Sequence, residues 1–138
     1  YDGSAELIDS FIKDNVATTW GGGIEIWSDA GNVSLDLDGT RVYGNDGGSA
    51  GGGIFMYEAP YTVSVLCDGT RSTAAGFYDN TADDGGGAFL YSGTLTATTC
   101  DTGTGSADND PDDVGGSPGS NNYANNASFV CTRSACTP

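Results

Sequence analysis

The stretch GGGIFMY at residues 51–57 decides the fold, because closely related stretches occur twice more in the chain. They are GGGIEIW at 21–27 and GGGAFLY at 85–91, and the three glycine runs begin 30 and 34 residues apart. A pattern repeated at such a period is typical of a solenoid, in which each repeat forms one coil and stacking buries a continuous core. Each run is expected to form a tight corner that needs positive φ angles.

A second alternating segment follows each glycine run. It reads NVSLDLDGTR at 32–41, TVSVLCDGTR at 62–71 and TLTATTCDTG at 94–103. Each coil therefore has two predicted strands whose apolar side chains point inward. The triplets expected to stack inside are Ile24, Ile54 and Ala88; Ile26, Met56 and Leu90; Val33, Val63 and Leu95; and Leu35, Val65 and Ala97. The triplet expected to face water is Ser34, Ser64 and Thr96.

An asparagine stands a few residues after an aromatic or apolar residue and before each glycine run. FIKDN ends at Asn15, VYGN at Asn45 and FYDN at Asn80. Equivalent residues of stacked coils lie about 4.8 Å apart, the strand spacing within a sheet. These asparagines are therefore expected to form a structural ladder of amide hydrogen bonds along the axis.

The pattern resembles the polymorphic outer-membrane-protein repeat first known from chlamydial surface proteins. That family repeats a Gly-Gly-Ala-Ile-like element and a Phe-x-x-Asn element, matched here by GGGI or GGGA and by FIKDN or FYDN. The resemblance covers roughly residues 5–100, and the spacing before the asparagine departs from the family's in some copies. It implies a right-handed parallel β-helix and an adhesive, surface-exposed role.

We predict an all-β fold, a short right-handed parallel β-helix (β-solenoid) of about three to four coils, in a single domain over residues 1–138. Residues 1–20 form an N-terminal cap or first coil, and residues 21–101 form the regular coils. Residues 102–138 form a long irregular loop, rich in Gly, Asp and Asn, and a disulfide-pinned C-terminal coil. A β-sandwich with Gly-rich hairpins is the alternative.

The four cysteines predict two disulfides and an oxidising compartment, hence a secreted, extracellular protein of the cell surface. Cys67 and Cys100 each follow a glycine run at nearly the same distance, so they are expected to share a rung and to pair. Cys131 and Cys136 form the second predicted bond. A zinc site is the weaker alternative, because the chain has no histidine.

The charge restricts the partners. Four Lys and Arg stand against 19 Asp and Glu, which gives a formal net charge of −15. Such a surface repels phosphate backbones and anionic lipid, which argues against nucleic acid as a partner and against membrane insertion. It suits cations and a calcium-rich setting.

Calcium is the predicted cofactor, with its ligands in the DNDPDD segment at 108–113. The candidate ligands are Asp108, Asp110, Asp112 and Asp113. Alternating oxygen ligands are typical of calcium loops, although a solvated acidic loop fits the segment equally well. A column of Asp38, Asp68 and Asp101 is a second pointer, because like charges one strand apart repel unless a cation or arginine offsets them.

An aromatic column is predicted on the outside of the solenoid. Its members, given by their alternation with the core positions, are Trp27, Tyr57 and Tyr91, with Phe55 and Phe89 beside them. Such a surface is a sugar-stacking platform, a subunit interface, or a face covered by the acidic loop. It is the candidate binding or assembly face.

Catalytic machinery is mostly missing from the sequence. Without histidine there is no Ser-His or Cys-His pair. The one arrangement to weigh as a polysaccharide lyase is Asp38 and Arg41 stacked on Asp68 and Arg71, and turn aspartates paired with arginines of neighbouring coils explain it better.

We therefore expect no enzyme, and no catalytic residues, but a structural and adhesive surface protein, a subunit that self-assembles into a cell-surface or secreted fibre. The alternative is a calcium-dependent carbohydrate-binding or polysaccharide-cleaving β-helix module. The expected partner is another copy of the chain or a surface glycan.

Overall fold

A computed structural model of the chain describes residues 2–29, 31–58, 63–68, 71–72, 75–91, 93–98, 100–101, 108–111, 114–115 and 128–131. In these ranges the regular secondary structure is β, with no helix. The strands are β1 (Gly3–Ile8), β2 (Phe11–Lys13), β3 (Ile24–Ser28), β4 (Val33–Asp38), β5 (Arg41–Tyr43), β6 (Ile54–Glu58), β7 (Val63–Asp68), β8 (Gly76–Tyr78), β9 (Ala88–Leu90), β10 (Thr94–Thr98), β11 (Val114–Gly115) and β12 (Ser128–Cys131).

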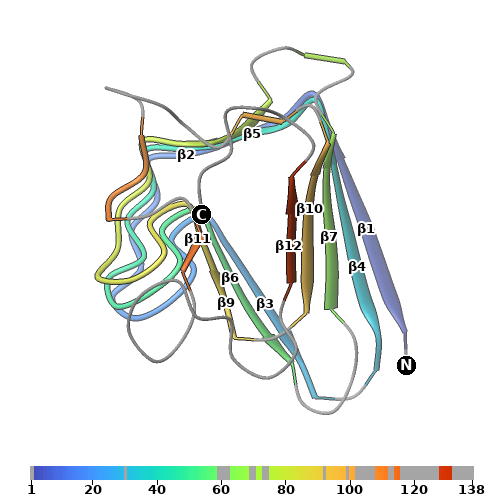
Figure 1. Ribbon diagram of the computed structural model, residues 1–138, viewed down its shortest axis with the longest axis horizontal. Helices are drawn as coiled ribbons and strands as arrows, with labels where there is room; N and C mark the ends of the chain where they lie inside the picture. Colours follow the sequence, from blue (N-terminus) through green and yellow to red (C-terminus); the bar gives the residue numbers. More distant parts are fainter. Residues whose placement is uncertain are drawn as a thin grey trace.

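The strands form three parallel sheets, which Figure 1 shows as separate walls around a common interior. Their orders are β1-β4-β7-β10-β12, β2-β5-β8 and β11-β9-β6-β3. Every pair of neighbouring strands runs parallel. The predicted β-solenoid is therefore confirmed, with about three full turns, and the sandwich is wrong, because hairpins would pair antiparallel strands.

Each of the first three coils adds one strand to each sheet. The first coil supplies β1, β2 and β3, so the N-terminal residues form a true coil that pairs with the second one. Part of the region expected to be irregular also continues the solenoid, since β11 pairs with β9 and the Asp110 backbone donates to the Asn80 carbonyl at 2.9 Å. Residues 102–107, 116–127 and 132–138 lie outside the described residues.

The core lies between the three sheets and is made of apolar side chains from alternate positions of each strand. Its most deeply buried members are Leu37, Val42, Ile54, Met56, Val65, Phe77, Leu90, Leu95 and Val114. Burying a side chain of this size stabilises the fold by about 1.5–3 kcal/mol. The alternation predicted from the sequence therefore identified the inward face correctly.

The register of β10 differs from the prediction by two residues. Leu95 pairs with Val65, and Ala97 pairs with Cys67. The reason is the length of the preceding corner, since the offset between coils changes from 34 residues at Ile54 and Ala88 to 30 at Val65 and Leu95. A slip of two leaves every side chain on its expected face, because the strand period is two.

The glycine runs make the corner that leads into the third sheet. The first glycine of each run has positive φ, at 63° for Gly21, 68° for Gly51 and 59° for Gly85. The third glycine of the middle run has another role, because a Cβ on Gly53 would lie 2.4 Å from the Gly87 carbonyl oxygen. Successive coils therefore approach one another closely at these corners.

The predicted asparagine ladder is present and longer than expected. The Asn15 side-chain amide donates to Asn45 Oδ1, and Asn45 donates to Asn80 Oδ1, both at 3.0 Å. Asn80 donates in turn to Asn109 Oδ1 at 3.0 Å. Each Oδ1 also accepts the backbone N–H of the preceding asparagine, so the ladder fixes the backbone at one corner of every coil.

The predicted disulfide between Cys67 and Cys100 is also present, with a Cα–Cα distance of 5.8 Å. The expected reason for it is wrong, because Ala97, not Cys100, occupies the rung next to Cys67. Cys100 lies beyond the end of β10 and is fully buried. The predicted bond between Cys131 and Cys136 lies outside the described side chains.

Candidate functional site: an aromatic outer face

The outer face of the sheet β3-β6-β9 carries a column of stacked aromatic rings. Trp27 and Tyr57 are in register on β3 and β6, with ring centroids 4.1 Å apart. Tyr91 follows β9 and continues the column at 4.7 Å from Tyr57. Its backbone N–H donates to the Met56 carbonyl at 2.9 Å, which holds the ring over the same sheet.

A second column lies beside the first and is buried. Phe55 and Phe89 stack at 5.4 Å, and both side chains are buried although they point away from the core. They form a separate apolar cluster with Ala50. The expectation that these phenylalanines add to the exposed surface is therefore wrong, because neighbouring side chains cover them.

Trp20 is the residue of this site that the sequence reasoning missed. Its ring stacks on Phe55 at 5.5 Å and lies 6.4 Å from the ring of Trp27. The signal was its position immediately before the first glycine run, which pairs it with Ala50 in the next coil. A large aromatic residue opposite an alanine fills the space above the phenylalanine column.

These rings line a shallow groove of about 240 Å³. Its lining consists of Trp20, Trp27, Ala50, Phe55, Tyr57, Phe89 and Tyr91. Trp27 is 49% exposed and Trp20 is 43% exposed, while the two tyrosines are half-buried. An exposed aromatic groove on a rigid sheet can hold the apolar side chains of a partner or the ring of a sugar.

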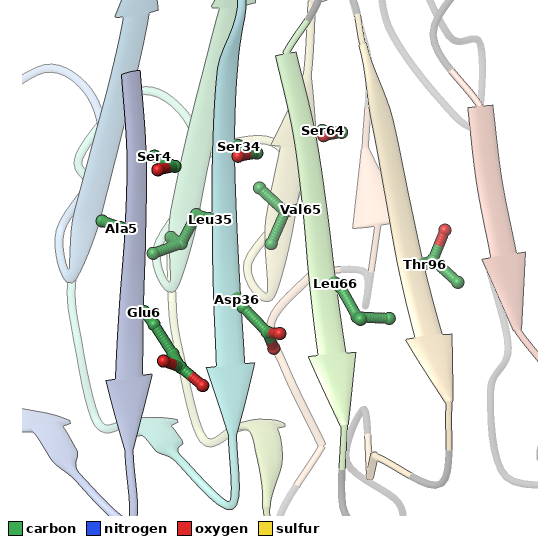
Figure 2. A pocket seen from close by; sticks show the side chains of 10 residues that line it. All are labelled: Ser4, Ala5, Glu6, Ser34, Leu35, Asp36, Ser64, Val65, Leu66 and Thr96. Carbon is green, nitrogen blue, oxygen red and sulfur yellow. The ribbon is translucent and has the colours of Figure 1, made fainter.

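A larger hollow of about 720 Å³ lies on the outer face of the five-stranded sheet, and the sequence reasoning did not identify it. Figure 2 shows Ser4, Ser34 and Ser64 in one row across β1, β4 and β7. In the same view Glu6 and Asp36 lie side by side, in register on adjacent strands. The lining of this hollow combines hydroxyl and carboxylate side chains with apolar ones, among them the exposed Leu66, and it contains no aromatic ring.

The Asp-Arg arrangement weighed as a lyase site is not a stack of equivalent pairs. Asp38 and Asp68 are in register, as predicted, but Arg41 pairs with Gly76. Arg71 instead donates to the Asp38 carboxylate, and this hydrogen bond raises the pKa of Arg71 above its ordinary value. The pair links two neighbouring coils and has a structural explanation.

The Arg41 guanidinium interacts with two aromatic residues at the same corner. The Arg41 guanidinium lies 5.2 Å from the ring of Phe11, a cation–π contact. Burial raises the pKa of Tyr78, and the nearby Arg41 lowers it by a smaller amount.

Asp101 is not the third member of the predicted aspartate column. Thr98 occupies the rung next to Asp68, and Asp101 forms a bridge to Gly76 instead.

The predicted calcium ligands are only partly described. Asp108 and Asp110 are exposed, and Asp112 and Asp113 lie outside the described residues. Asn109, between the first two, belongs to the asparagine ladder and is buried. Within the described ranges, no group of three or more His, Cys, Asp or Glu side chains is placed to hold a metal ion, and calcium binding stays a prediction.

Comparison with known proteins finds no matching family model, no matching curated protein and no matching solved structure. Across the described ranges, no helix is long and apolar enough to cross a bilayer.

Proposed function

We propose that the protein is a non-catalytic, extracellular structural and adhesive protein of the cell surface, which self-assembles through its aromatic face. The observation that carries this proposal is the stacked column of the exposed Trp27 and the half-buried Tyr57 and Tyr91, backed by buried phenylalanines. Tryptophan and tyrosine are the residues most often found as interface anchors. A contiguous exposed aromatic groove on a soluble protein marks an interaction site.

The scaffold behind the groove suits a structural role. A four-member asparagine ladder and a buried disulfide tie successive coils together. The groove residues lie on or beside β3, β6 and β9 of one sheet, and surfaces held on such a scaffold usually change position little when a partner binds. The repeat's resemblance to chlamydial surface-protein repeats supports the same class of function.

The net charge of −15 opposes contact between copies. Added salt screens such repulsion over about 10 Å or less, and divalent cations can bridge facing carboxylates. Assembly through the aromatic face is therefore expected to strengthen as salt or calcium is added. An apolar contact between two like-charged surfaces strengthens with added salt, because the salt screens their repulsion.

A glycan is the second candidate partner, favoured by the exposed indole rings of Trp20 and Trp27. A sugar stacks on a free ring face. Within the column the ring of Tyr57 lies between those of Trp27 and Tyr91, so neighbouring rings cover both of its faces. The column therefore offers a sugar free ring faces only at its ends and not at Tyr57, which favours the protein interface as the main function.

The test replaces Trp27 and Tyr57 with serine and compares particle size by light scattering at millimolar calcium. The wild-type chain is expected to form large particles and the double variant to remain small. The control replaces Tyr43 and Tyr78, another stacked pair on a different sheet, with serine. This control is expected to assemble like the wild type.

Two results would contradict the proposal. A monodisperse wild-type monomer would show that the chain does not assemble, and quenching of tryptophan fluorescence by soluble polysaccharides would then support the glycan. A Trp27 and Tyr57 double variant that assembles as well as the wild type would exclude this face as the contact.

A further inference from the structure

Two stretches of the chain match the acceptor triplet for N-linked glycans, which is Asn-x-Ser or Asn-x-Thr with x other than proline. They are Asn32-Val33-Ser34 and Asn126-Ala127-Ser128. The first lies wholly within the described residues, whereas Asn126 lies outside them. Neither includes an asparagine of the ladder, whose members are Asn15, Asn45, Asn80 and Asn109. The structure therefore places one candidate modification site, separate from the asparagines that hold the coils together.

This triplet is in phase with strand β4, whose first residue is the middle member of the triplet. Val33 packs against the core, and side chains alternate between the two faces of a strand. Asn32 and Ser34, on either side of Val33, are both exposed. The acceptor amide and the hydroxyl that completes the triplet therefore share the outer face of the five-stranded sheet.

The main chain at Asn32 is held by bonds that do not use the side-chain amide nitrogen. Its N–H donates to the Asp2 carboxylate at 2.9 Å, and its carbonyl accepts the Gly3 N–H at 2.8 Å. In the corner that precedes β4, the Ser28 hydroxyl donates to the Gly31 carbonyl. A group attached to the amide nitrogen leaves these bonds in place, so the fold can accept it.

The surface beside Asn32 has room for a sugar. Asn32 lines a shallow hollow of about 500 Å³ together with Ser4, Ser34 and Ser64. Figure 2 shows these three serines in one row across β1, β4 and β7. Their hydroxyls can donate to and accept from the hydroxyls of a sugar, directly or through water. The first residue of an attached glycan would therefore meet a hydroxyl-bearing surface.

The disulfide between Cys67 and Cys100 supports the cellular route that this modification requires. Disulfides form and persist mainly in oxidising compartments outside the cytosol. The acceptor triplet likewise acts in chains that are secreted. A buried disulfide and an exposed acceptor triplet are separate observations that favour the same route, and the inference rests on the extracellular role proposed above.

We propose that Asn32 carries an N-linked glycan that covers the outer face of the five-stranded sheet. In the reaction, the Asn32 side-chain nitrogen bonds to the anomeric carbon of a lipid-pyrophosphate-linked oligosaccharide. The bond from that carbon to the pyrophosphate oxygen breaks, the lipid pyrophosphate leaves, and the amide nitrogen loses one proton. The transfer needs no oxidant or reductant.

The glycan and the aromatic groove belong to different sheets. Asn32 precedes β4 of the five-stranded sheet, whereas Trp27 and Tyr57 lie on β3 and β6. A glycan is bulky and solubilising, and it excludes contact over the surface that it covers. Contact between copies is therefore directed away from the five-stranded sheet and towards the aromatic face.

The test is peptide mapping of the chain, fused to a cleavable secretion signal and secreted by eukaryotic cells that carry out N-glycosylation. Trypsin cleaves after Lys13 and Arg41, and the resulting peptide of residues 14–41 holds one acceptor triplet, at Asn32. This peptide is expected to carry a glycan that peptide N-glycosidase removes, with conversion of Asn32 to aspartate. Digestion in heavy-oxygen water labels the new carboxylate and distinguishes it from spontaneous deamidation.

Three variants of the triplet distinguish this reaction from other modifications. Asn32→Gln and Ser34→Ala are each expected to lose the glycan, whereas Ser34→Thr is expected to keep it because threonine retains the hydroxyl. All are made in an Asn126→Gln background, so that the second triplet adds nothing to the mass. Each variant of the first triplet changes an exposed side chain, and melting temperatures within a few degrees of wild type would show that misfolding does not cause the loss.

An unmodified peptide 14–41 from the secreted chain would overturn the proposal, as would a glycan on this peptide that persists in Asn32→Gln. Both results leave assembly through the aromatic face standing, because particle size measures that assembly and Trp27 and Tyr57 carry it. Conversely, a secreted chain that is glycosylated at Asn32 but stays monomeric at every salt and calcium concentration would overturn assembly and support the glycan site.

Discussion

Asn45 donates its side-chain amide to Asn80 Oδ1 at 3.0 Å, and both side chains are buried between successive coils. The second N–H of Asn45 donates to the Ile12 carbonyl, and its Oδ1 accepts from Asn15. One side chain thus satisfies polar groups of the coils on both sides. In a chain with this much glycine, such contacts hold the corners in register.

Replacement of Asn45 by alanine is therefore expected to be costly. It leaves several polar groups inside the protein without partners, at about 1–3 kcal/mol each, and a total loss of about 3 kcal/mol or more is expected. Asn15→Ala is the matched control, because Asn15 is exposed and water can replace its contacts. Denaturant unfolding measures both, and equal losses for the two variants would contradict a buried ladder.

Loss of the disulfide between Cys67 and Cys100 is expected to destabilise the domain by about 3–4 kcal/mol, the loop-entropy value for a closed loop of this size. The two cysteines are 33 residues apart in sequence. The measurement compares thermal unfolding of the wild type with that of a double alanine variant. An unchanged melting temperature would show that the bond does not constrain the unfolded chain.

Gly53→Ala is expected to lower stability by about 2 kcal/mol or more, because the added Cβ would meet the Gly87 backbone at 2.4 Å and overpacking forces the coils apart. Gly3→Ala is the control, since nothing lies within 4 Å of a Cβ at that position. A change of about 0.5 kcal/mol or less is expected there. Calorimetry of the two variants distinguishes close coil contact from the general cost of replacing glycine.

Asp36→Asn is expected to stabilise the protein by about 0.2–1 kcal/mol, the usual range for relieving like charges on adjacent strands. Asp36 is in register with Glu6, and its Oδ1 is buried and accepts no hydrogen bond from the described residues. The gain should disappear in a Glu6→Gln background. Asp38→Asn provides the contrast, because it weakens the ion pair with Arg71 and should not stabilise.

Much of the fold could be predicted because its signals are local. Alternation identified the inward face of each strand, and the glycine spacing identified the coils. The register of β10 could not be read from the glycine runs, because it depends on the length of a corner whose path has no marker in the sequence. The glycine runs therefore predict that Leu95 pairs with Val63, two residues before its actual partner Val65.

The candidate site was predicted in part. The outward direction of Trp27 and Tyr57 follows from strand alternation, but the burial of Phe55 depends on Trp20, a contact across a corner that no period reveals. Asn109 was missed for a different reason. Its acidic neighbours favoured a calcium loop, and the ladder spacings of 30, 35 and 29 residues are too irregular to extrapolate from one coil to the next.

Electron microscopy of the purified chain at millimolar calcium tests the central claim, self-assembly through the aromatic face, most directly. Large assemblies are expected for the wild type, and their loss is expected when Trp27→Ser and Tyr57→Ser are combined, because the exposed end of the ring column is then removed. Monodisperse single chains of the wild type under all conditions, or a double variant that assembles as well as the wild type, would contradict it.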